Sequence, residues 1–312
     1  MDVAKQQAPP ASPLVTVARK PRREPEKWLF LLPAVFFLLV MSLGPLLFSV
    51  VLTFSTWILS KPDSFIEFSG LYNLQRLITD PRFYNALKNT ATFVVVSVPV
   101  QYLIGLGLAL LLNQEIKGRK VFRVLFFMPF MLSSVVVGFV IGKMLLNEAV
   151  GPTNHFLTLL GLPRVMWLSQ PNIALLSLVA VDAWHSVAFS MIILLAGLQA
   201  MPQEPFESAR IDGATAWQTF RYLTFPMLWP VSLTVLLLRS IATWRIADLI
   251  LIMTGGGPGD VTESLSVYIY RLGIKYTDIG YATAMGQVLL WIVVIYLAVF
   301  MTAANRWGPK TE

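Results

Sequence analysis

Between two long apolar runs lies the segment PFESARIDGATAWQTFRYLTFP, which occupies residues 205–226. Glu204 and Pro205 suit a first helical turn, because an acid favours the positive end of the helix dipole and proline lacks only an N–H that would be unpaired there. Gly213 suits the end of that helix, since glycine takes a positive φ without strain. The pattern therefore predicts two short helices that are broken at Asp212-Gly213.

The second of these helices, predicted over Ala214–Leu223, is amphipathic. At about 100° per residue its two faces differ: one is polar, and the other carries Ala216, Trp217, Phe220 and Leu223. Two interpretations stay open at this point. The helix rests on lipid headgroups, as many amphipathic helices do, or it forms a surface on which another protein docks.

The composition predicts an all-α integral membrane protein. Of 312 residues, 56% are hydrophobic and 13% are charged, and the mean hydropathy is +0.66, which is too apolar for a soluble domain. Cysteine is absent, so disulfides and thiolate chemistry are excluded. The two histidines, His155 and His185, lie in different segments without a metal-binding pattern, and no metal site is expected.

Six apolar runs are long enough to cross about 30 Å of hydrocarbon at 1.5 Å per residue. They are approximately Trp28–Phe54, Ala91–Leu112, Val124–Leu146, Ile173–Leu198, Pro226–Met253 and Gly280–Ala304. Pro129 is expected to interrupt the third. The chain is therefore divided into a disordered basic tail (1–27), a six-helix transmembrane domain (28–305) that includes the loop 200–226, and a short tail (306–312).

The distribution of basic residues sets the expected orientation. Lys117, Arg119, Lys120 and Arg123 fall between the second and third runs, and the leading tail is also basic. The positive-inside rule places these segments, both termini and the loop after the fourth run in the cytoplasm. The net charge of +7 then reflects topology, and nucleic-acid binding is not expected. A cleaved signal peptide is disfavoured because the first apolar run is too long.

Two outer loops carry local signals. Asp80-Pro81 is typical of a helix start, an N-cap followed by proline at the first helical position; nearby aromatic residues are alternatively an interfacial belt. Gly255-Gly256-Gly257-Pro258 lacks the lysine and the preceding strand of a phosphate-binding loop. It is therefore interpreted as a tight outer turn.

The segment 205–226 resembles a known signature. Glu207-Ser208-Ala209, three residues, Gly213, nine residues and then Leu223-Thr224-Phe225-Pro226 are similar to the E-A-A-x3-G-x9-I-x-L-P motif of binding-protein-dependent ABC importer permeases. Ser208, Leu223 and Phe225 depart mildly from it. Two further segments, Lys117-Gly118 with Phe122-Arg123 and Thr254–Pro258, resemble the carbohydrate (maltose-type) members of that family.

The resemblance implies a pore-forming subunit that performs no chemistry and imports a carbohydrate-like solute. Its partners would be a second related permease, two ATPase subunits that bind the ATP and Mg, an extracytoplasmic solute-binding protein and membrane lipid, in the plasma (inner) membrane of a bacterium or archaeon. The loop would be the coupling helix that seats in the ATPase. The residues expected to carry this contact are Glu207, Ser208, Ala209, Asp212, Gly213, Ala214, Trp217 and Phe220.

Polar residues at membrane depth are the candidates for the path of the solute, because they are costly in lipid and usually face the bundle interior. Aromatic rings suit the apolar faces of a sugar, and charged or amide groups suit its hydroxyls. The candidates are Asp182, Trp184, His185, Arg239, Thr243, Trp244, Arg245 and Gln287. The alternative is structural: Asp182 and Arg239 pair with each other to hold the bundle together, and Gln287 forms an interhelical hydrogen bond.

Two other classes of function would need residues that the apolar runs lack. A secondary transporter driven by an ion gradient would need carboxylates at the midplane and inverted repeats, but Asp182 is the only acid clearly at mid-depth. An intramembrane enzyme would need an Asp pair, a His–Glu zinc pattern or a Ser–His pair, and none appears in the apolar runs. Copurification of an ATPase subunit separates the importer from the secondary transporter.

Overall fold

The computed structural model describes residues 25–62 and 64–307, which fall into two compact units divided between Phe48 and Ser49. The first helix, α1 (Pro25–Thr53), begins three residues earlier than predicted. Residues 1–24 of the predicted tail lie outside the described residues. The last helix, α13 (Ile279–Trp307), continues to the end of the described range, two residues beyond the predicted domain.

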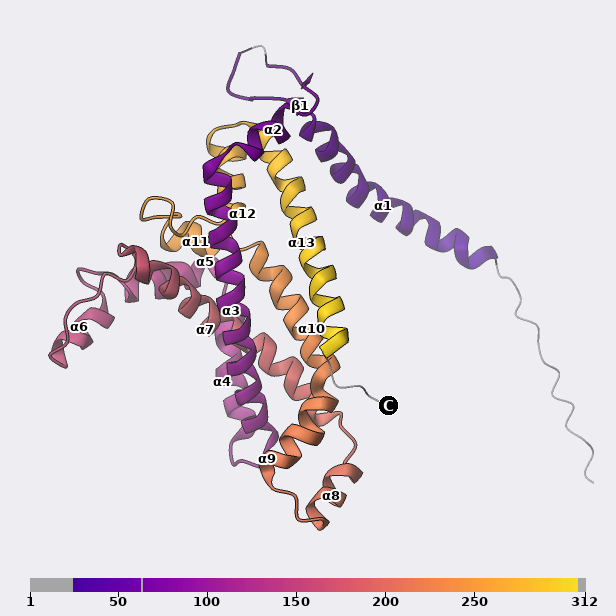
Figure 1. Ribbon diagram of the computed structural model, residues 1–312, viewed down its shortest axis with the longest axis vertical. Coiled ribbons are helices and arrows are strands. Elements are labelled where there is room, and N and C mark those ends of the chain that lie inside the picture. Colours follow the sequence, from indigo (N-terminus) through magenta and orange to yellow (C-terminus); the bar gives the residue numbers. More distant parts are fainter. Residues whose placement is uncertain (1–24, 63, 308–312) are drawn as a thin grey trace, which may run out of the picture. The chain divides into compact units, whose positions relative to one another are not determined.

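Long helices dominate the second unit (Figure 1): α3 (Pro81–Asn113), α7 (Pro171–Gln199), α10 (Phe225–Trp244) and α13. With α1, the described residues contain five helices long and apolar enough to cross a membrane, or up to six if one bent pair counts as a span. This agrees with the predicted all-α membrane fold. The bent pair corresponds to the third apolar run.

The third run is broken near its middle. Its first part is α4 (Arg119–Met131), and its second part is α5 (Ser134–Val137), which continues as the π-helix η1 (Gly138–Leu145). The two parts meet at 91°. Pro129 removes a backbone donor from the last turn of α4, and the Ser133 hydroxyl caps the new helix by accepting from the Val135 N–H at 3.3 Å. The predicted interruption is therefore a sharp bend.

The fifth run is also divided, which the sequence did not predict. α10 ends at Trp244, and a separate helix, α11 (Asp248–Met253), follows. Arg245, one of the candidates for the solute path, directly follows α10, and Asp248 begins α11, so the two residues lie on either side of the break. α11 packs closely on η1. The two helices approach so closely at Gly142 that a side chain there would collide with Met253.

Short elements occupy the end of the second unit where α3 begins. They are the antiparallel pair β1 (Ser55–Thr56) and β2 (Glu67–Phe68), α2 (Tyr72–Ile78), α12 (Leu265–Tyr270) and the π-helix η3 (Arg271–Lys275). A further helix, α6 (Pro152–Leu159), falls in the connection between η1 and α7.

Asp80 begins α3 as predicted and also joins three helices. Its carboxylate accepts from the Arg82 N–H at 2.9 Å and from the Tyr268 and Tyr281 hydroxyls at 2.7 and 2.6 Å. Burial alone would raise the pKa of Asp80, but the tyrosine and backbone hydrogen bonds outweigh it and hold that pKa below its ordinary value. The Arg76 guanidinium lies 3.9 Å from the centre of the Tyr281 ring.

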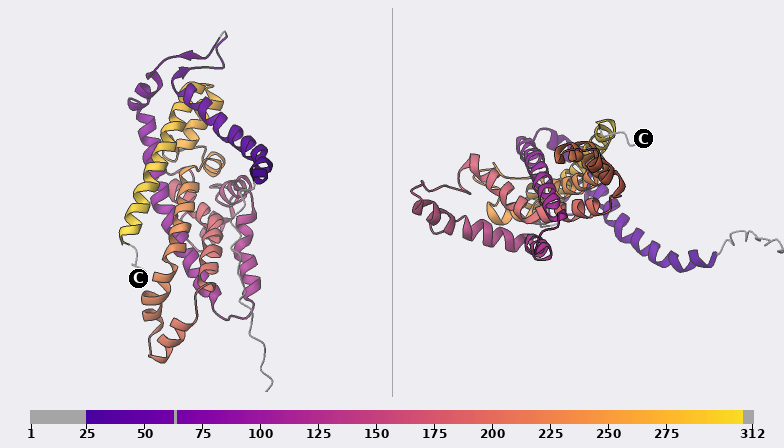
Figure 2. Two further views of the ribbon diagram at one scale, coloured as in Figure 1. Left: turned by 90° about the vertical axis from the view of Figure 1, so that its right-hand side faces the viewer. Right: turned by 90° about the horizontal axis from the view of Figure 1, so that it is seen from below.

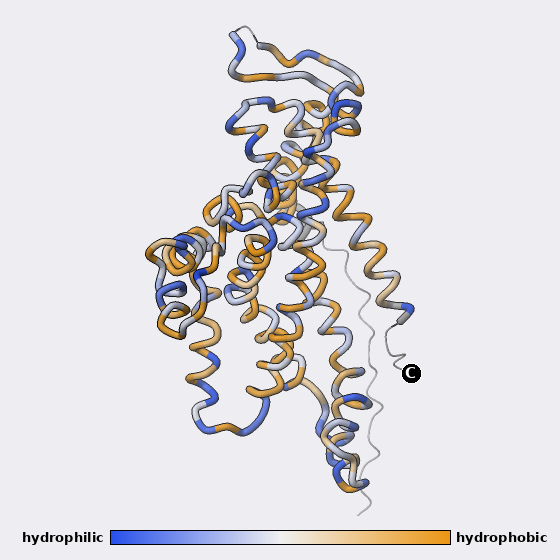
Figure 3. Tube along the Cα trace, turned by 60° about the vertical axis from the view of Figure 1, so that its left-hand side comes forward, coloured by the Kyte–Doolittle hydropathy of each residue, from blue (hydrophilic) through white to orange (hydrophobic). Residues whose placement is uncertain are grey.

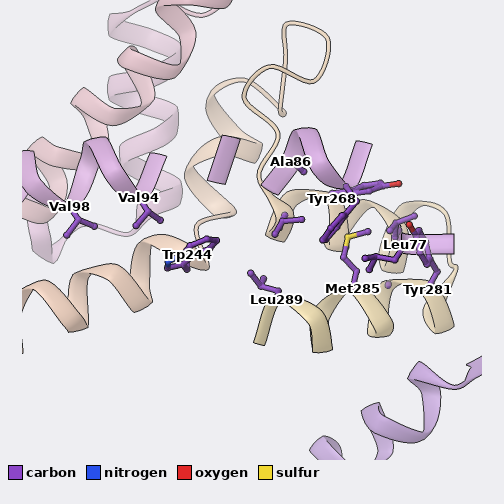
Figure 4. Packing of buried hydrophobic residues seen from close by; sticks show 13 residues of the cluster. Leu77, Ala86, Val94, Val98, Trp244, Tyr268, Tyr281, Met285 and Leu289 are labelled. Atoms are coloured by element: carbon purple, nitrogen blue, oxygen red, sulfur yellow. The ribbon is translucent and has the colours of Figure 1, made fainter. Parts of the chain in front are cut away.

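Apolar packing continues inward from this polar junction (Figure 4), where Leu77, Ala86, Tyr268 and Met285 belong to one buried cluster. Deeper in the unit, α3 and α7 cross closely. A Cβ added at Gly105 would lie 2.6 Å from the Cβ of Ser190, so only glycine permits this approach. The long helices are thus held at fixed spacing by close packing.

The glycine-rich connection forms a tight turn, as predicted. Gly255 and Gly256 have φ values of +61° and +91°, and the hydroxyls of Thr254 and Thr262 lie 2.8 Å apart. Glu263 stabilises the turn. Its side chain is 0% exposed, and its carboxylate accepts from Arg82 Nε at 2.7 Å and also from Arg271.

Candidate functional site

The loop after α7 begins with the helix α8 (Glu204–Ile211), as predicted. Pro205 lies in its first turn, Glu204 and Glu207 are acidic residues of that turn, and Arg210 is a basic residue of its last turn, so the charges complement the helix dipole. Gly213 follows with a φ of +75°. The predicted break at Asp212-Gly213 is confirmed.

The second helix of the loop differs from the prediction. It begins at Ala216 because Thr215 and Gln218 form a capping box, in which each side chain bonds to the backbone of the other. α9 (Ala216–Thr219) then passes through the π-helix η2 (Phe220–Thr224) directly into α10. The loop helix predicted over Ala214–Leu223 is therefore the start of one membrane helix, Ala216–Trp244.

Part of the apolar face of this segment packs on its own bundle: Phe220 is half-buried against a core cluster, whereas Trp217 stays mostly exposed. The rings of Trp217 and Phe220 stack at 5.7 Å, and those of Phe225 and Trp229 continue the series. Behind them is a cavity of about 610 Å³ whose lining includes Leu198 and Phe206. The stack fixes the orientation of α9 while leaving space beneath it.

The other side of the loop is an open surface. Neither α8 nor α9 contains a buried residue, and Glu207, Ser208 and Arg210 are exposed. Ile211 is 86% exposed and Trp217 is 65% exposed. Both side chains are therefore free to contact another surface. The sequence prediction did not single out Ile211, although it directly precedes Asp212 at the break.

The loop lies at the opposite end of the second unit from α2 and the β1–β2 pair (Figures 1 and 2). The connection between α3 and α4 lies at the same end, since Gln114 lines the cavity that Trp217 lines. Both segments are hydrophilic connections between hydrophobic helices (Figure 3). The basic residues of this connection, Lys117, Arg119, Lys120 and Arg123, are thus on the side of the loop.

A second feature is a buried polar cluster shared by α3, α7 and α10. Asp182 is 6% exposed and Arg239 is 7% exposed. Asp182 Oδ2 accepts from Ser97 Oγ at 2.8 Å and from Gln101 Nε2 at 2.6 Å, while Ser186 Oγ donates to Oδ1 at 3.3 Å.

Gln101 links the two charges of this cluster. Its Oε1 accepts from Arg239 Nε at 2.6 Å, and the Arg239 Nη2 lies 3.9 Å from Asp182 Oδ2. The cluster is therefore a nearly closed network, which limits the cost of burying two charges. Ser97 and Gln101 were not predicted. A signal was available, because they are four residues apart in an apolar run and so share a helix face.

The other candidates for the solute path are dispersed. Thr243 is buried and donates to the Arg239 carbonyl at 2.8 Å, whereas Trp244 packs against Tyr296. Trp184 and Arg245 are exposed. His185 Nε2 lies 3.0 Å from the Leu132 carbonyl at the bend, and Gln287 Nε2 donates to Ser49 Oγ at 2.6 Å. Only Asp182, Arg239 and Thr243 are brought together.

Comparison with known proteins decides the family. Residues 101–308 match the model of the binding-protein-dependent transport system inner membrane component. The chain belongs to this family. The permease is 38% identical over 86% of its length to a probable ABC transporter permease of Sinorhizobium fredii, 85% of which is covered. Its role is that of the membrane subunit of an ABC transporter.

Two further relatives carry informative names. The trehalose/maltose transport system permease MalF of Thermococcus litoralis is 33% identical, with 90% of this permease and 93% of the relative covered. The lactose transport system permease LacF of Rhizobium radiobacter is 34% identical, with 89% and 94% covered.

A solved structure confirms the fold. A chain of a bacterial alginate ABC transporter, in complex with an alginate-bound periplasmic protein, aligns with a TM-score of 0.79 at 24% identity and covers 91% of the permease and 95% of itself.

Proposed function

We propose that this permease forms half of the pathway of an ATP-driven importer for a carbohydrate-like solute. The observation that carries the proposal is the loop α8–Gly213–α9. It is exposed, it has no buried residue, and it is continuous with a helix that crosses the membrane. A cytoplasmic ATPase that grips this loop would move a membrane helix directly.

The proposed contact with the ATPase uses the outward side of the loop, with Glu207, Ser208, Ala209, Asp212 and Ala214 around the bend at Gly213. Ile211 would be an apolar anchor at its centre, since burying such a side chain contributes about 1.5–3 kcal/mol. Phe220 would act differently, by holding η2 against the bundle, and the exposed Trp217 would join the contact with the ATPase. ATP and Mg would be bound by the ATPase and not by this chain.

The carbohydrate class rests on the relatives that are named for trehalose, maltose and lactose. The buried cluster supports it in part. Asp182, Arg239 and Thr243 offer the charged and hydroxyl groups that bind sugar hydroxyls, but in this conformation they bond to one another and to Gln101. The solute can reach these residues only if the hydrogen-bond network opens. Their main role in this proposal is therefore to hold the three helices together, and contact with the solute is a second role.

The proposed assembly completes the pathway with three kinds of partner. A second related permease would supply the other half, two ATPases would bind the loops, and a solute-binding protein would deliver the solute at the end that carries α2 and the β1–β2 pair. Both termini and the loop would be cytoplasmic, in the plasma membrane of a bacterium or archaeon. Positive charge at the loop end supports this orientation.

Site-directed cross-linking tests the proposal. A photoreactive residue at Ile211 or Ala209 should form an adduct with an ATPase subunit in native membranes, and one at Phe68 in β2 should not. If the loop position reacts only with lipid, or is labelled from outside the cell by an impermeant reagent, the coupling role is refuted.

A further inference from the structure

A groove runs along the outside of the bundle between α4 and α7. It has a volume of about 500 Å³ and begins at Arg123 and Gln199, near the ends of these helices at the loop side. Its walls are otherwise apolar, with Val124, Phe127 and Met131 from α4 and Ile192 from α7. One end of the groove is therefore polar, and the rest is hydrocarbon-like.

The polar end contains an incomplete charge site. Arg123 Nε and Nη2 are both buried, and neither has a hydrogen-bond partner within the part of the chain that the structure describes. A buried cation without a partner is costly, and native structures pair or neutralise such groups. These two nitrogens lie on one edge of the guanidinium plane. They form a fork that fits two oxygens of a single phosphate or carboxylate.

The location of the groove favours a lipid phosphate. Arg123 is in the second turn of α4, next to the exposed Lys117 and Lys120 of the basic connection. Clusters of this kind between helices on the cytoplasmic side bind anionic headgroups. A neighbouring protein helix would have to bring a carboxylate into an apolar groove at the membrane, which is costly.

The apolar length of the groove fits an acyl chain. From Arg123 to Met131 the α4 axis rises about 12 Å at 1.5 Å per residue. Val124 and Met131 are 62% and 73% exposed, and α4 contributes no buried residue to the bundle. The groove is thus open along its side to the bilayer, and only the Arg123 side chain has to turn for a phosphate to reach its two buried nitrogens.

We propose that this groove binds one anionic phospholipid, with its phosphate on the Nε–Nη2 edge of Arg123, its headgroup near Gln199 and one acyl chain along Phe127, Met131 and Ile192. The site is distinct from the loop that contacts the ATPase, and it needs no assumption about the transported solute. It assigns to the Phe122-Arg123 segment a role in lipid binding.

The test uses the full-length chain, delipidated in detergent and titrated with dioleoyl phosphatidylglycerol, with bound lipid counted by native mass spectrometry. The wild type should retain one phosphatidylglycerol and much less dioleoyl phosphatidylcholine. Loss of a bidentate charge-assisted contact should weaken that retention by roughly ten-fold in Arg123→Ala. Arg123→Lys should be intermediate, and Lys120→Ala is the matched control, since it removes an exposed charge outside the groove.

A second variant protects the test against misfolding of Arg123→Ala. Ile192→Trp fills the apolar part and leaves the guanidinium in place, and it should also reduce the retained lipid. A photoreactive residue at Val124 should form an adduct with lipid in nanodiscs that contain phosphatidylglycerol. Equal retention by Arg123→Ala and wild type, equal binding of the two lipids, or an adduct at Val124 with a protein subunit alone would overturn the proposal.

Discussion

Replacing Gly213 with valine tests the bend in the loop. The φ of +75° at this position lies in the left-handed region, which is unfavourable for any L-residue with a side chain and most of all for a β-branched one. A Cβ built at Gly213 meets no atom within 4 Å, so no collision is involved. The effect of the substitution is confined to the backbone.

The size of the expected effect follows from the backbone cost alone. An L-residue in the left-handed region costs about 1–2 kcal/mol, which lowers the population of the native turn about five- to thirty-fold. Valine should be at the upper end of this range. Asparagine tolerates the same φ because its side chain bonds locally, so Gly213→Asn is the matched control.

The assay is solute uptake by proteoliposomes that contain the complete transporter, measured with ATP hydrolysis in the same sample. Gly213→Val should insert at wild-type levels but transport less solute per ATP by about the factor given above, whereas Gly213→Asn should stay near wild type. Normal uptake per ATP in Gly213→Val, with the variant confirmed in the membrane, would refute the inference that α8 and α9 must keep this bend.

Three further predictions concern the bundle and its outer end. Asp182→Ala should destabilise the permease by about 3–5 kcal/mol and reduce its folded amount, because Arg239 keeps its hydrogen bond to Gln101 but loses the carboxylate 3.9 Å from it; Asp182→Asn should be milder, and a changed uptake KM with normal folding would instead indicate solute contact. Gly105→Leu should destabilise the permease by about 1–3 kcal/mol or more and so lower its thermal midpoint, since the new side chain would push α3 away from Ser190; an unchanged midpoint contradicts that packing. Because the pKa of Asp80 is lowered from 3.8, its stabilisation is complete above that pH and is lost as the pH falls through the lowered pKa. The midpoints of wild type and Asp80→Asn should therefore differ at neutral pH and converge only in acid, and a difference that disappears between pH 7 and 5 contradicts the role of Asp80.

The features that sequence predicted correctly are those that a few neighbouring residues determine. Asp80-Pro81 begins a helix because a carboxylate and a proline both suit its first turn, and Asp212-Gly213 ends one because glycine takes the required φ. Pro129 signalled an interruption for a similar reason. In each case the physical cause lies within one turn of the residue that reveals it.

The features that were missed depend on distant partners. The run from Pro226 to Met253 is apolar throughout, so hydropathy predicts one span, yet the chain breaks after Trp244 and α11 packs on η1 at Gly142. Gln101 joins Asp182 to Arg239 across three helices, and its role follows from the crossing of α3 and α7. A single sequence without a known fold does not place these residues together.

The continuity of α9, η2 and α10 has a mechanical consequence. Twenty-nine helical residues, Ala216–Trp244, make a rod of about 43 Å at 1.5 Å per residue. The hydrogen-bonding pattern changes at η2 and Pro230 lies within α10, but no loop separates the exposed end of the rod from its membrane part. If the rod moves as one body, a tilt of about 10° about one end displaces the other end by roughly 7 Å, more than one helical pitch. The ATPase would then move this membrane helix as a lever, and a small displacement of the loop below the bilayer would become a larger displacement at the opposite end of the helix.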